Sequence, residues 1–227
     1  MNWAGLAGLK SMRTALLPEP GPRRVYAIAT LVNTFGFGLV VTSLPLWIVG
    51  HTRAPGWSVG ALLLLNTFIV IAFQVRVGRN VTTIRRGGAA VRRAGLLFTV
   101  SCCAIGFSAP LPDWAALLVL AAAIAVLSIG EVNHAAGTFT LDFGLAPAHA
   151  QGQYQGLAGL GLGAGGAAAP TVMIGLCLTF GTAGWIGLGA FFAVLGLTAP
   201  AIARRGERTR PAFLAEPLPL TGSTNYR

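Results

Sequence analysis

The chain has 227 residues, of which 54% are hydrophobic and only 10% are charged, and its mean hydropathy is +0.70. A soluble domain of this length has about a quarter of its residues charged, so the composition argues against a water-soluble globule and favours an integral membrane protein. The formal net charge of +10 does not indicate nucleic-acid binding, because the basic residues cluster in the gaps between apolar runs.

Six apolar runs are candidates for transmembrane helices, which need about 20 residues each. They are Val25–Gly50, Trp57–Val75, Gly95–Ala109, Trp114–Leu141, Gly156–Phe180 and Gly184–Ala203. The third run is the shortest and needs residues on either side to span. We therefore predict an all-α membrane protein with a cytoplasmic segment at 1–22, a six-helix transmembrane domain at 23–206 and a proline-containing, disordered cytoplasmic tail at 207–227.

The positive charges predict an orientation for this domain. Fifteen of the sixteen Lys and Arg residues fall on one side of the six runs, and only Arg53 falls on the other. Basic loops stay on the cytoplasmic side, so both termini are predicted to be cytoplasmic. Trp57, Trp114 and Trp185 lie near the outer ends of their runs, where we expect interfacial anchors. The bias towards Arg, Ala and Gly is typical of high-GC bacteria, so a multi-pass protein of a bacterial plasma membrane is expected.

Glu131 is the only acidic residue inside any of the six runs. A carboxylate there costs several kcal/mol unless it is paired, protonated or hydrated, so it is either a proton-coupling group or half of a structural ion pair with Arg76 or Arg79. Counted from Trp114, it lies about 25 Å inward, near the cytoplasmic edge, which favours the ion pair. His134 and Thr138 share its helical face and form either a proton relay with it or an ordinary interfacial group.

Uncharged polar residues in the first two runs are candidates for a substrate cavity. Asn33 lies in the first run, and Asn66, Thr67 and Gln74 lie in the second. Such residues either line a cavity or form hydrogen bonds between helices. Asn66 is predicted near the middle of the membrane and is the stronger cavity candidate.

The fifth run is rich in glycine, and its Gly159/Gly163 spacing is typical of helices that approach closely. Pro170 predicts a kink in the same run. No sequence signature of a hydrolase, a zinc protease or paired catalytic carboxylates is present, so we predict neither an enzyme nor a metal or cofactor. The cysteines Cys102, Cys103 and Cys177 are predicted to be apolar packing residues.

Two groups of residues resemble parts of major facilitator superfamily transporters of high-GC bacteria. The segment from Leu44 to Val49, with Asn66–Thr67 and Phe73–Val77 after it, is similar to the seventh and eighth helices of that family. The segment from Gly130 to Gly137, followed by Gln151–Gly156, is similar to its tenth helix and the next connector. The resemblance covers residues 40–206 and implies the C-terminal six-helix half of a twelve-helix fold.

The resemblance also implies a function and partners. A six-helix half is expected to transport a small molecule, with drug efflux as the commonest activity of such relatives, and to need a homodimer or a second six-helix half to complete the two-lobed cavity. The alternative is a non-transporting remnant or a membrane interaction protein. Residues 12–34 resemble the family's opening helix, so the chain is expected to be an internally shortened member, joined near residues 38–43. No nucleic-acid partner is expected.

In that family, arginines after the second helix of each half clamp an acid in the fourth helix. The resemblance therefore implies that Arg76 or Arg79 engages Glu131 and closes the cytoplasmic face. On this interpretation, Glu131→Gln reduces stability or shifts the conformational balance more than it removes proton coupling.

Overall fold

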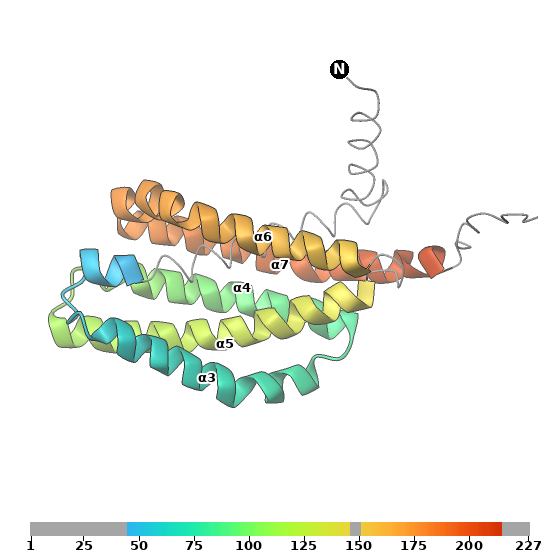
Figure 1. The fold of residues 1–227 in the computed structure, drawn as a ribbon, viewed down its shortest axis with the longest axis horizontal. Helices are drawn as coiled ribbons and strands as arrows, with labels where there is room; N and C mark the ends of the chain where they lie inside the picture. Colours follow the sequence, from blue (N-terminus) through green and yellow to red (C-terminus); the bar gives the residue numbers. More distant parts are fainter. Residues whose placement is uncertain (1–44, 146–150, 215–227) are drawn as a thin grey trace, which may run out of the picture.

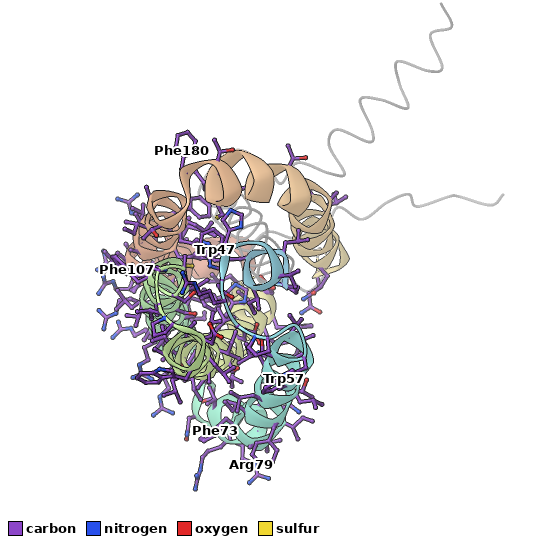
Figure 2. All side chains as sticks on the ribbon, turned by 90° about the vertical axis from the view of Figure 1, so that its left-hand side faces the viewer. Trp47, Trp57, Phe73, Arg79, Phe107 and Phe180 are labelled. Carbon is purple, nitrogen blue, oxygen red and sulfur yellow. The ribbon has the colours of Figure 1, made fainter. Side chains whose placement is uncertain are left out.

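The computed structural model describes residues 45–145 and 151–214, and every regular element in these ranges is helical. A short helix at 45–51 is followed by α3 (Ser58–Asn80), α4 (Ile84–Phe107), α5 (Asp113–Leu145), α6 (Gln151–Val172), the π-helix η2 (Met173–Leu178) and α7 (Thr182–Leu214). The long helices run side by side (Figure 1). Seen along the bundle, α6 and α7 stand apart and η2 bridges them, whereas α3 lies on the opposite side (Figure 2).

Four helices of the described chain are long and apolar enough to cross a membrane. They are α3, α4, α5 and the part of α7 from Thr182 to Arg208, and they correspond to the second, third, fourth and sixth predicted runs. The fifth run falls on α6 and η2. The first lies outside the described residues except for 45–50. An all-helical structure with four helices that could span a membrane is therefore confirmed for the described residues, while the count of six spans and the orientation of the termini stay predictions.

The boundaries of several helices differ from the apolar runs. α4 begins at Ile84, eleven residues before the predicted run, so the arginine-rich segment is mostly helical and only residues 81–83 separate α3 from α4. The Thr83 hydroxyl caps α4 by accepting a hydrogen bond from the backbone N–H of Arg86 at 3.3 Å. Arginine is a good helix former with a long side chain that reaches water from a helix end, so the arginines interrupt the apolar run without ending the helix. At the other terminus, α7 continues to Leu214, past the predicted domain boundary.

The closest helix packing joins α4 to α7, and small residues repeat at intervals of seven along both. Gly88, Gly95 and Cys102 of α4 face Ala203, Gly196 and Gly189 of α7, in antiparallel order. A Cβ added to Gly95 would lie 2.6 Å from the Phe192 carbonyl oxygen and 2.7 Å from Gly196 Cα. Thr99 adds a polar tie, because its hydroxyl lies 2.8 Å from the Gly189 carbonyl oxygen. The two backbones are therefore in direct contact, which fixes the position of α4.

Gly159 and Gly163 of α6 do not make the close contact that their spacing predicted. A Cβ added to Gly159 or Gly163 would meet no atom within 4 Å among the described residues. The helix continues through position 170 and turns into the π-helix η2 at Met173. A missing backbone N–H at a proline removes one hydrogen bond of the ladder, and π-helical turns occur where that ladder is irregular.

The main core cluster lies at the η2 end of the bundle. It contains Trp47, Trp185, Cys102 and Cys177, so the packing role predicted for these two cysteines is confirmed. The prediction for Trp185 was wrong: this side chain is fully buried, with its ring 5.7 Å from that of Trp47 in an edge-on arrangement. The chain turns back at Gly181 just before it, which carries Trp185 into the bundle. Trp57 and Trp114 are exposed, as expected.

Candidate functional site: a carboxylate in a cavity between α3 and α5

Glu131 is held by a side-chain amide on the neighbouring helix. Asn66 of α3 donates both amide hydrogens to α5: Nδ2 lies 2.8 Å from Glu131 Oε2 and 2.9 Å from Ser128 Oγ. The Ser128 hydroxyl in turn donates to the Ile124 carbonyl oxygen at 2.7 Å. Each donor of this hydrogen-bond network therefore has an acceptor. The Glu131 carboxylate receives its hydrogen bond from a neutral amide and not from a positively charged group.

This hydrogen bond places Asn66 and Glu131 at one level of the bundle. The sequence predicted different levels, with Asn66 near the middle of the membrane and Glu131 near its edge, and the contact between them contradicts that difference. Fourteen residues separate each of them from the C-terminal end of its helix, Asn80 for α3 and Leu145 for α5. That is about 21 Å of helix in both cases. Counting residues from Trp114 misplaced Glu131 relative to Asn66, because α5 extends further than α3 at the N-terminal end of these two helices.

The predicted ion pair of Glu131 with Arg76 or Arg79 is not formed in this conformation. Among the described residues, Glu131 has no basic partner within salt-bridge distance, whereas Arg85 at this end of the bundle pairs with Glu207 at 3.2 Å. Arg76 lies ten residues beyond Asn66 on α3, about 15 Å along the axis, and both Arg76 and Arg79 are exposed. This separation along the helix axis explains why the predicted ion pair does not form.

A cavity of about 760 Å³ lies between α3 and α5, from Glu131 towards the arginine-rich end. Its lining is mainly apolar, from Val70 on α3 to Phe139 and Phe143 on α5, and its polar side chains are Glu131, Gln74, Thr82 and Thr140. A mostly apolar cavity with a few polar groups has the composition of a small-molecule site. The structure thus brings together Glu131 and Gln74, which were assigned to separate roles from the sequence.

The other predicted site residues lie elsewhere. His134 is buried with its ring 6.0 Å from that of Phe98 on α4, so it packs towards a different helix from Glu131. The Thr138 hydroxyl donates to the His134 carbonyl oxygen of its own helix at 2.8 Å. Neither residue lines the cavity. Asn33 lies outside the described residues, as does the junction predicted near residues 38–43.

Ser128 is a member of this site that sequence reasoning missed. It is fully buried and stands three residues before Glu131, so both side chains lie on one face of α5. A polar residue three positions from the only acid of an apolar run was the available signal. This signal was ambiguous, because a serine in an apolar helix commonly donates its hydroxyl to a backbone carbonyl of its own helix. Ser128 makes such a bond in addition to the one from Asn66.

The described residues contain no group of three His, Cys, Asp or Glu side chains placed to hold a metal ion. No protein-family model matches the chain, and searches of curated proteins and of solved structures give no match. The fold and the site therefore define a class, an all-helical protein with membrane-spanning helices and a carboxylate in a cavity. The resemblance to the major facilitator superfamily stays a prediction.

Proposed function

We propose that this chain is a transmembrane transporter of major facilitator type, in which Glu131 carries the coupling proton or contacts a small-molecule substrate. The observation that supports this most directly is the position of Glu131: it lies in a cavity of about 760 Å³, hydrogen-bonded to an amide and without a basic partner among the described residues. A carboxylate in such a place can take up and release a proton as the cavity changes its exposure to water. Acidic residues inside membrane-spanning helices commonly mark ion or proton pathways.

Transport and stability respond differently to loss of the Glu131 charge. Glu131→Gln keeps an oxygen that accepts from Asn66 but removes the titratable group, so we expect a folded protein that has lost proton-driven flux. Glu207→Gln is the matched control, because Glu207 is partly exposed and pairs with Arg85 outside the cavity. An ion pair of Glu131 with Arg76 or Arg79 predicted the opposite, that Glu131→Gln would reduce stability more than proton coupling.

The measurement is flux into proteoliposomes under an imposed pH gradient, with a mixture of small organic solutes outside and mass spectrometry of the lumen. Wild-type protein and the Glu207→Gln variant should change the luminal level of at least one solute, and Glu131→Gln should not. Luminal contents equal to those of protein-free liposomes for all three proteins would favour the alternative, a non-transporting membrane interaction protein.

We also propose that the transporting unit contains a second set of helices, from a homodimer or a separate six-helix half. The open small-residue face of α6 at Gly159 and Gly163 supports this, since such faces allow two helices to approach closely. Light scattering of the purified protein in detergent tests the homodimer, which requires the protein mass of two chains. A mass of one chain would leave only a separate half as the partner.

A further inference from the structure

A second pocket, of about 430 Å³, lies at the arginine-rich end of α3 and α4. Its lining residues come from three helices and the turn between two of them: Val77, Asn80, Val81, Arg86, Ala89, Arg93 and Asn133. The helices α3 and α4 both pack on α5, and the pocket occupies the space that this arrangement leaves between them. No acidic residue is among the lining residues.

The two arginines of this pocket are fixed by the geometry of α4. Arg86 and Arg93 are seven residues apart and therefore share one face of the helix, about 10 Å apart along its axis. The Thr83 cap sets the first turn of the helix at Arg86, and Arg86 Nη1 donates to the Asn80 carbonyl oxygen at 3.3 Å. Side chains of this length can converge on one group that lies between them.

Neither guanidinium has an acidic partner in the described part of the chain. Arg93 has no hydrogen bond or ion pair there, and the one bond of the Arg86 side chain is to a neutral carbonyl. Arg85, next in sequence to Arg86, does have such a partner, since its Nε lies 3.2 Å from Glu207 Oε2. Two unneutralised cations on one pocket favour an anion between them, and guanidinium groups bind phosphate oxygens in a bidentate manner.

We propose that this pocket binds the phosphate of an anionic phospholipid headgroup. Arg93 lies two residues before the apolar run that begins at Gly95, so the pocket is at the predicted boundary of the membrane. Its remaining wall, formed by Val77, Val81 and Ala89, is apolar and suits the glycerol and upper acyl region of a lipid better than it suits a free ion. Basic pockets between helices at this level are suited to lipid phosphates.

The test uses the full-length protein in a neutral detergent, with phosphatidylglycerol as the probe and native mass spectrometry to count bound lipid. Wild-type protein should retain phosphatidylglycerol in preference to phosphatidylcholine. The double variant Arg86→Gln/Arg93→Gln should bind it about tenfold more weakly, the loss expected for charge-assisted hydrogen bonds. Arg79→Gln/Arg92→Gln removes the same charge from exposed positions outside the pocket, and it should reduce binding less than about threefold.

Two further measurements distinguish a lipid site from general surface charge and from a site for soluble phosphate. Arg93→Gln alone tests the site without touching a hydrogen bond of the fold, and it should also weaken phosphatidylglycerol binding. Inorganic phosphate, added in excess over the lipid, should not displace it. Equal losses for the two double variants would overturn the proposal in favour of general surface charge. Complete displacement by inorganic phosphate would overturn the lipid assignment in favour of a soluble phosphate.

Discussion

Replacing Gly95 with alanine should lower the free energy of unfolding by about 3 kcal/mol, which is at the upper end for one methyl group forced into a packed interior. The new Cβ would lie 2.6 Å from the Phe192 carbonyl oxygen and 2.7 Å from Gly196 Cα. Both are backbone atoms, so no side chain can move aside and α4 has to shift away from α7. Because Gly88 and Cys102 lie on the same face of α4, the shift disturbs the whole contact between the two helices.

The matched control is Gly187→Ala on α7. A Cβ at Gly187 meets no atom within 4 Å, so the free energy of unfolding should not fall and should rise by up to about 1 kcal/mol through the higher helix propensity of alanine. Unfolding of both variants in mixed detergent and dodecyl sulfate micelles, followed by circular dichroism, measures the difference. Equal stability of the two variants would show that α4 and α7 are not in backbone contact.

Asn66→Leu should destabilise the protein by about 2 kcal/mol, the cost of leaving a half-buried polar group without its partner. Leucine has nearly the size of asparagine but provides no donor to Glu131 Oε2 or Ser128 Oγ. The adjacent Thr67→Val is the control. Its hydroxyl is exposed and bonds only the Leu63 carbonyl oxygen of its own helix, so its loss should have little effect.

A double-mutant cycle with Glu131→Leu separates the hydrogen bond from other effects of Asn66→Leu. Once the carboxylate is gone, the missing donor costs less, so the double variant should be more stable than the sum of the single changes by about 1 kcal/mol. The same unfolding measurement applies. Strictly additive losses would mean that Asn66 and Glu131 do not interact in the folded protein.

Composition and hydropathy predicted the helical class and six membrane spans, four of which fall on helices of the described chain that are long and apolar enough to cross a membrane, because a helix in lipid needs a long uncharged run and little else. The helix that packs most closely was harder to predict. The composition of the glycine-rich fifth run predicted close packing there. The close contact instead lies where small residues repeat every seven positions in two separate helices, at Gly88 and Gly95 on α4 and at Gly189 and Gly196 on α7. A repeat of seven in both partners, read in antiparallel order, was the informative signal.

The site was partly predictable for a related reason. Glu131, Asn66 and Gln74 stood out one by one because polar groups are costly in an apolar run. Their grouping depended on how α3 and α5 are offset along their axes, which no single run encodes. Because the sequence did not show where α5 begins relative to α3, Glu131 was predicted close to Arg76 and far from Asn66. That position favoured a structural ion pair over a carboxylate in a cavity.

Access to the cavity from the two sides of the membrane tests transport most directly. Ala135 lines the cavity one helical turn from Glu131, and it can be replaced by cysteine in a protein whose three native cysteines are alanine. Arg79→Cys and Trp114→Cys, both exposed at opposite ends of the bundle, serve as references for the two sides. The reagent is a membrane-impermeant maleimide, applied to right-side-out and to inside-out vesicles.

An alternating-access transporter predicts that Ala135→Cys reacts in both kinds of vesicle and that the ratio shifts with pH while Glu131 is present. Arg79→Cys should react only in inside-out vesicles, and Trp114→Cys only in right-side-out vesicles. Reaction of Ala135→Cys from one side alone, unchanged by pH, would contradict transport through this cavity.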